Sequence, residues 1–169
     1  MEVQFDIKLE PKDLFKFNMR QGYTSSQGII SIIVPIAIMG YTIFAGSASD
    51  IMHLIINIAL ALLFLFYLPI TYSVRSKAVL KKNAVLANTL HYCISEKNIK
   101  VTQGEESGEL EWDQIYKMVS TKNYIYIFTS RINAYIIPIH QTDGQYNQIV
   151  EIAKEKLEKY RVNMKLRKA

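Results

Sequence analysis

Two uninterrupted apolar runs constrain this chain more than any other feature of its sequence. Residues Gly28 to Gly46 form a run of 19 residues without a charge, and Ile51 to Tyr72 form a second run of 22. At a rise of ~1.5 Å per residue, a helix made of the first run would span roughly 28 Å, close to the ~30 Å hydrocarbon core of a bilayer. The two runs therefore predict two transmembrane helices, at residues 28–46 and 51–72.

The segment between the runs, Ser47 to Asp50, is so short that the two helices must be antiparallel neighbours. A secretory signal is the weaker interpretation of the first run, because 27 residues of mixed charge precede it and a second span follows. A buried hairpin in a soluble protein is also disfavoured, because residues 28–72 contain a single charge, Asp50, over two successive long runs. We therefore expect a membrane hairpin.

Basic residues flank the hairpin and avoid its turn, which predicts that both termini are cytoplasmic. The flanking residues are also candidates for contact with an anionic inner leaflet, although they could serve only to set the topology. They are Lys12, Lys16, Arg20, Arg75, Lys77, Lys81 and Lys82. The net charge of +5 is modest and spread along the chain, so a membrane surface explains it better than nucleic acid, which we do not expect as a partner.

Asn57 is the polar residue in the spans that most invites a role. Its amide could bond across to the first helix near Ser31 or Tyr41, or equally to its own helix. Two helices cannot enclose a pore, so a transport function would require a homo-oligomer.

The remaining sequence predicts a β-rich cytoplasmic domain. Val3, Phe5, Ile7 and Leu9 alternate with polar residues, as in a half-buried strand. Residues 12–27 suggest an interfacial helix, and residues 73–88 a juxtamembrane helix that continues the second span. Short strand signals then recur up to residue 139 and are followed by an amphipathic helix.

This order of elements suggests a pleckstrin-homology-like domain. A lone strand is marginal in water, so the first strand needs the sheet that follows the hairpin. We therefore expect a domain split between residues 1–11 and 89–161, with the membrane hairpin inserted after its first strand. Residues 162–169 read as a frayed basic tail.

The chain resembles the YcxB-like family of small bacterial membrane proteins over nearly its whole length. The resemblance rests on the first strand, the paired spans and four short segments, which are Lys12–Phe17, Trp112–Lys117, Tyr124–Phe128 and Ala134–Pro138. It implies a pleckstrin-homology-like fold in a bacterial cell membrane and brings no established activity. Where the family often has basic residues after the proline, Ile139 and His140 stand here, which argues against an anion site.

No pattern of catalytic, metal-binding or cofactor-binding residues is present in the sequence. Three histidines without common spacing and one cysteine make no zinc motif, and seven glycines form no phosphate loop. Cys93 and Trp112 are expected in the core. The tyrosines of the strands are numerous enough that some should be exposed, and an exposed cluster would suit a protein partner. These candidates are Tyr116, Tyr124, Tyr126 and Tyr135.

Three functions remain open from the sequence. The leading one is a non-catalytic membrane-anchored protein whose cytoplasmic domain binds a protein partner or the anionic membrane surface. A toxin-immunity or envelope-stress protein and a component of a small oligomeric transporter are the alternatives.

Overall fold

The computed structural model describes residues 1–44 and 50–167, and the chain divides into two compact units. The helical unit contains Leu14–Val79. The β unit combines Met1–Asp13 with Leu80–Ala169, so it is assembled from both ends of the chain. The division between the units falls inside the first helix, after Asp13.

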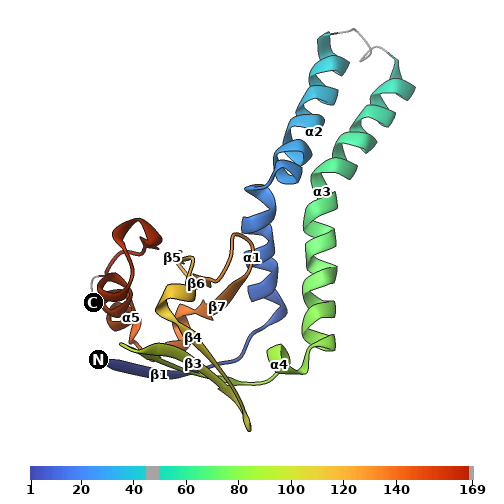
Figure 1. Ribbon diagram of the computed structural model, residues 1–169. Helices are drawn as coiled ribbons and strands as arrows, with labels where there is room; N and C mark the ends of the chain where they lie inside the picture. Colours follow the sequence, from blue (N-terminus) through green and yellow to red (C-terminus); the bar gives the residue numbers. More distant parts are fainter. Residues whose placement is uncertain (45–49, 168–169) are drawn as a thin grey trace. The chain divides into compact units, whose positions relative to one another are not determined.

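Three helices make up the helical unit, and two of them are long and apolar enough to cross a membrane (Figure 1). They are α1 (Pro11–Tyr23), α2 (Ser26–Phe44) and α3 (Ile51–Lys82). The predicted spans agree with α2 and α3 over the described residues, while Gly46 and the turn at 47–49 lie outside them. The second span and most of the predicted juxtamembrane helix form one continuous helix, which ends before Asn83; the four-residue α4 (Ala84–Ala87) follows.

Small and polar side chains let the helices of this unit approach closely. A Cβ on Gly22 would lie 2.4 Å from the Tyr72 ring, and one on Gly28 would lie 2.2 Å from the carbonyl oxygen of Gly22. Asn18 of α1 donates a hydrogen bond of 3.2 Å to the hydroxyl of Ser76, which is fully buried in α3. Such contacts are those by which helices associate where apolar burial gives no driving force.

The first sheet of the β unit pairs the N-terminal strand with strands that follow the helices. Its order is β1 (Glu2–Ile7), β2 (Leu90–Ser95), β3 (Asn98–Gln103) and β4 (Glu106–Glu111), all antiparallel. In the β1–β2 register Phe5 lies opposite Tyr92, and their rings stack with centroids 5.7 Å apart. The alternation of apolar residues predicted for β1 is present, because Val3, Phe5 and Ile7 are all buried.

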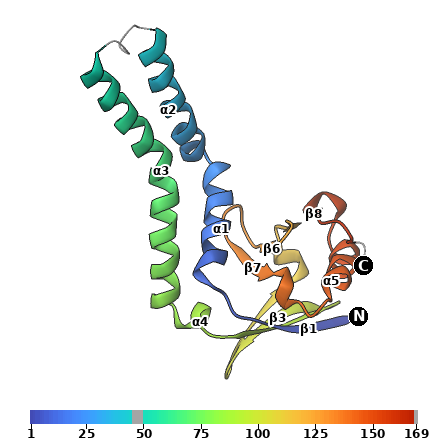
Figure 2. The same cartoon turned by 180° about the vertical axis from the view of Figure 1, so that it is seen from behind.

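The second sheet is built around two central strands and receives a strand from the end of the chain (Figure 2). Its order is β7 (Ala134–Pro138), β6 (Tyr124–Phe128), β5 (Lys117–Ser120) and β8 (Val162–Asn163). The first three strands are antiparallel, while β8 runs parallel to β5. Single 3-10 turns lie at Trp112–Gln114, Ile139–Gln141 and Lys159–Arg161, and α5 (Tyr146–Lys156) packs its apolar face inward.

The core of the β unit combines residues from both sheets and from α5. Its fully buried aliphatic side chains come from strands of each sheet, from the turn before β5 and from the helix, and include Ile7, Ile94, Ile99, Ile115, Ile125, Ile127, Ile137 and Ile149. Burying each such side chain stabilises the fold by about 1.5–3 kcal/mol. The predicted β-rich region with a closing helix is thus present as two four-stranded sheets and α5.

Two sequence-based expectations about the β unit are wrong. Cys93 is not in the core: it is half-exposed between the buried Tyr92 and Ile94, and its thiol donates to Glu2 at 3.2 Å. Because side chains alternate along a strand, an apolar segment alone did not tell which face Cys93 takes. The C-terminal segment is not frayed up to Arg167, because β8 and several hydrogen bonds hold it to the β unit. Trp112 is buried as predicted, with its indole donating to the carbonyl of Ser95 at 3.1 Å.

Candidate functional site

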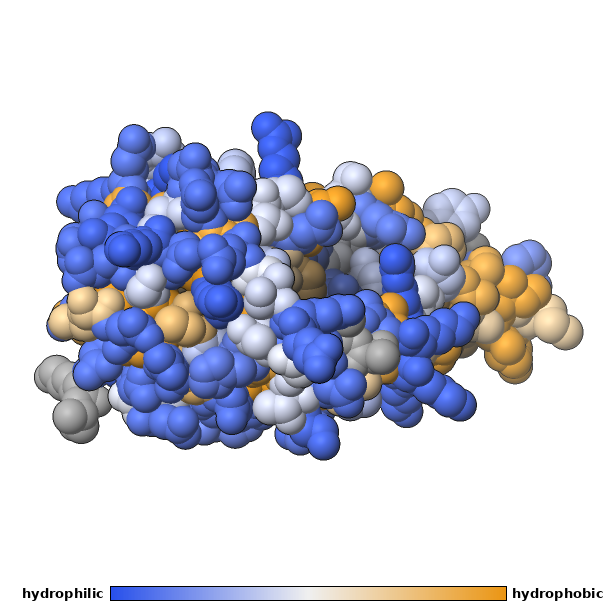
Figure 3. Space-filling view, turned by 60° about the horizontal axis from the view of Figure 1, so that its bottom comes forward, coloured by the Kyte–Doolittle hydropathy of each residue, from blue (hydrophilic) through white to orange (hydrophobic). Residues whose placement is uncertain are grey.

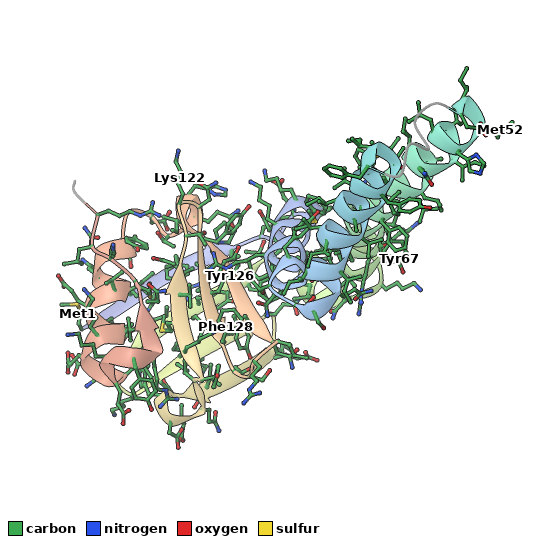
Figure 4. All side chains as sticks on the ribbon, turned by 90° about the horizontal axis from the view of Figure 1, so that it is seen from above. Met1, Met52, Tyr67, Lys122, Tyr126 and Phe128 are labelled. Atoms are coloured by element: carbon green, nitrogen blue, oxygen red, sulfur yellow. The ribbon has the colours of Figure 1, made fainter. Side chains whose placement is uncertain are left out.

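The helical unit exposes a continuous apolar surface. Only 22% of the apolar window of α2 and 11% of that of α3 is buried within the protein, so neither is packed like the core helix of a soluble domain. Met52 and Tyr67 of α3, labelled in Figure 4, belong to this exposed surface. In Figure 3 hydrophobic colour gathers over the hairpin, while the β unit is largely hydrophilic on the face shown. Patches of this extent mark a surface that meets lipid or another protein.

The seven basic candidates are all exposed side chains on α1 and α3. Lys12, Lys16 and Arg20 recur every fourth residue along α1, and Lys12 forms an ion pair with Glu10 at 2.6 Å, which raises the pKa of the lysine. On α3, Lys77 and Lys81 also lie one turn apart, with Arg75 and Lys82 displaced around the helix. The structure thus presents exposed basic side chains along α1 and in the last turns of α3.

Asn57 bonds across the hairpin to the first span, as one of the two predicted alternatives had it, and its partner is Thr42, next to Tyr41. Its side-chain nitrogen donates to the hydroxyl of Thr42 at 2.9 Å, and that hydroxyl donates to the carbonyl of Ile38 at 2.8 Å. Thr42 is buried, and Ser31 instead donates to Gly28 in its own helix at 2.7 Å, while Tyr41 is exposed. The amide therefore serves to join α3 to α2 inside the hairpin.

The four candidate tyrosines divide into two exposed and two buried residues. Tyr116 and Tyr135 remain partly exposed, which keeps them available to a partner. Tyr124 and Tyr126 are buried on β6, with their rings 5.9 Å apart, and they cannot form part of an exposed surface. Tyr126 is labelled in Figure 4. β6 is a central strand whose five residues are all buried. Its unbroken run Tyr-Ile-Tyr-Ile-Phe is the signal that could have predicted burial on both faces.

A buried carboxylate that the sequence analysis missed holds the start of α1. Asp13 is 1% exposed and accepts hydrogen bonds of 2.8 Å from the hydroxyl of Tyr124 and from the backbone N–H of Glu10. Burial, and next the bond to Asp13, raise the pKa of Tyr124 well above its ordinary value. The sequence signal was present: Pro11 at the first helical position and an acid two residues later are typical of a helix start.

The part of the chain that the structure describes offers no metal centre, since no three His, Cys, Asp or Glu side chains gather there. Asp50 caps the start of α3 by accepting from the backbone of Met52 at 2.9 Å, and it pairs with His53 at 2.8 Å. His91 pairs with Asp6 at 2.7 Å across β1 and β2. His53 and His91 thus each have a structural partner.

Comparison with known proteins identifies a family for part of the β unit but gives no function. Residues 94–153 match the family model described as YcxB-like protein, which confirms the resemblance seen in the sequence. The match runs from the end of β2 into α5 and includes the three segments around Trp112, Tyr124 and Tyr135; it does not include β1 or the two long helices. No curated protein and no solved structure matches the chain.

Proposed function

We propose that this chain, YcxB-like over residues 94–153, is a non-catalytic membrane-anchored protein whose β unit binds a protein partner at the cytoplasmic face. The observation that carries the proposal is the contrast between its two units. The long helices leave most of their apolar windows exposed, whereas the β unit encloses a complete apolar core under a polar surface. An apolar hairpin joined to a water-soluble unit is an anchor with a module attached.

The arrangement of the β unit supports a pleckstrin-homology-like plan. Four antiparallel strands precede three more, and a helix closes the domain. Folds do not carry function by themselves, so the binding role rests on the surface. Tyr116 and Tyr135 are among its exposed aromatic side chains, and such side chains are enriched in protein interfaces.

The basic residues of α1 and α3 support a cytoplasmic position for both chain ends. In our proposal they lie at the inner leaflet, where each contributes up to about 1 kcal/mol of attraction to anionic lipid. A test places single cysteines at Ser47 and at the exposed Lys97 of a Cys93→Ser variant. In intact cells, an impermeant thiol reagent should label the first and spare the second. Labelling of Lys97→Cys alone would contradict the topology.

Photo-crosslinking in native membranes tests the partner-binding role directly. A photoreactive amino acid at Tyr116 or Tyr135 should capture a discrete protein, while the same amino acid at the buried Tyr126 should not. The buried position controls for nonspecific capture by an unfolded chain. If the exposed positions capture nothing beyond lipid, the β unit has no protein partner at this surface.

A further inference from the structure

The C-terminal segment 162–167 lies against strand β5 and the start of helix α5. Val162 and Asn163 form the parallel strand β8 beside Met118 and Val119 of β5. The following residues continue along the start of α5, whose Tyr146 and Asn147 contact them. We call the surface formed by Met118, Val119, Thr121, Tyr146 and Asn147 the tail seat; strand β8 and helix α5 are labelled in Figure 2.

Most polar contacts of the tail seat reach main-chain atoms of the segment. The side-chain amide of Asn147 donates to the carbonyl of Arg167 and accepts from its N–H, both at 2.9 Å. The hydroxyl of Tyr146 lies 2.8 Å from the carbonyl of Lys165 and 2.8 Å from the hydroxyl of Ser120. A carbonyl only accepts, so the phenol donates to Lys165. Any extended peptide would present these main-chain groups.

Two side chains of the segment give the tail seat its selectivity. Met164 is buried, whereas Lys165 and Leu166 point into solvent. The guanidinium of Arg167 lies 4.4 Å from the centre of the Tyr146 ring and donates to the carbonyls of Thr121, at 2.8 Å, and Lys122, at 2.6 Å. Lys122, labelled in Figure 4, lies in the turn between β5 and β6. The seat thus accommodates an apolar residue followed three positions later by arginine.

The segment joins the sheet over a short length. Its strand pairing covers two residues, and Met164 is its one buried apolar side chain. Short segments with few buried apolar side chains open at lower free-energy cost than a domain core. When the segment leaves, β5 becomes an unpaired sheet edge, and such edges accept an added strand from another chain.

We propose that the tail seat is the peptide-binding site of this protein and that its own C-terminal segment occupies it as an internal competitor. The occupant in the bound state is an extended segment of a partner protein that carries an apolar residue three positions before an arginine. This inference rests on the proposed partner-binding function and gives it a second contact site, separate from Tyr116 and Tyr135. The tethered tail sets the affinity that a partner needs, because the partner must outcompete a segment present at high effective concentration.

The test measures binding of a fluorescent synthetic peptide, residues 160–167 of this chain, to the purified 169-residue chain in lipid nanodiscs. The native chain should bind it poorly. A Met164→Ser/Arg167→Ala variant of the same length, which weakens the internal competitor but leaves the seat intact, should bind at least about tenfold more tightly. A chain ending after Arg161 should bind the peptide as tightly as this variant does. Equal binding by native and tail-weakened chains would overturn the proposal.

Matched variants decide whether binding occurs at this seat. In the tail-weakened chain, Asn147→Ala should reduce affinity about tenfold, while Gln148→Ala, at the exposed neighbouring position, should leave it unchanged. An Arg167→Ala peptide should bind weakly, but a Lys165→Ala peptide normally, because Lys165 contributes its carbonyl. Equal effects of Asn147→Ala and Gln148→Ala would place the peptide elsewhere.

Two further outcomes bear on the partner. A concentration-dependent dimer of the native chain that disappears on removal of residues 162–169 would assign the seat to a second copy's tail and overturn a separate partner. Failure of the peptide to bind while Tyr116 or Tyr135 still captures a protein would refute the tail seat and leave the partner-binding function standing.

Discussion

The two units of this protein distribute apolar and small residues in opposite ways. In the β unit the buried positions are aliphatic and aromatic, such as Phe5, Ile94 and Ile127, and the outer face is polar. In α2 the buried positions are Gly28, Ser31, Pro35 and Thr42, while its isoleucines point outward. Water drives apolar side chains inward, whereas a lipid environment leaves close packing and hydrogen bonds to join helices. Four experiments test this difference between the two units.

The largest effect is expected from a charge placed in the core of the β unit. Phe5 is 2% exposed and stacks on Tyr92, so Phe5→Asp removes an aromatic contact and buries an unpaired carboxylate. Loss of the ring alone costs about 3–5 kcal/mol, which can exhaust the stability of a small unit. Proteolysis of membrane fractions should show a degraded β unit and intact helices.

The control for this substitution is Gln4→Asp, which adds the same charge on the exposed face of the same strand. It should leave the protease resistance of the β unit nearly unchanged. Equal sensitivity of the two variants would mean that β1 contributes no core face.

A charge on the exposed surface of the hairpin should act nearly as strongly, although the same change on a soluble helix would be almost neutral. Leu63 lies in α3 and is exposed. Leu63→Arg should cost about 2.5–3.5 kcal/mol of insertion free energy if this surface faces lipid. A glycosylation-based insertion assay measures the cost, with Leu63→Ala as the size control. Normal insertion of the arginine variant would contradict the lipid-facing assignment.

Alkaline pH should destabilise the β unit through its buried tyrosines. Burial raises the pKa of Tyr92 above the value of 10.0 that applies in the unfolded chain. Above pH 10 the unfolded state loses this proton while the folded state keeps it, so the free energy of unfolding falls with pH. The slope attributable to Tyr92 approaches 1.4 kcal/mol per pH unit.

Tyr92→Phe isolates this slope, because the variant lacks the ionisable hydroxyl and keeps the ring. Chemical unfolding between pH 9 and about 11.5 should show the native protein losing stability relative to the variant only above pH ~10. Parallel pH curves for the two proteins would show that Tyr92 ionises equally in both states.

The smallest effect is expected at the polar contact within the hairpin. Asn57→Ala removes the hydrogen bond to Thr42, and such bonds in helical membrane proteins contribute about 0.6 kcal/mol on average. A double-mutant cycle with Thr42→Val, measured by unfolding in mixed micelles, gives the coupling energy. No coupling would mean that close packing alone joins α2 and α3.

Some features of this protein could be predicted from its sequence patterns, and others depended on its tertiary structure. The two apolar runs, the alternation in β1 and the helix α5 followed from composition and periodicity, because burial on one face or on all faces leaves a repeating trace along the chain. The same patterns predicted that Trp112 is buried, and it is, although it lies in a 3-10 turn rather than in a strand.

The sequence could not decide which side chains meet, because those contacts join residues that are distant along the chain. Tyr124 was predicted as a surface candidate, but its hydroxyl donates a buried hydrogen bond to Asp13, 111 positions away. Cys93 was expected in the core, but in the register with β1 its thiol lies beside Glu2. The basic tail looked frayed because its anchors, Tyr146 and Asn147, lie on another element. Local periodicity reports how much of a segment is buried, whereas strand register and long-range hydrogen bonds determine against what it is buried.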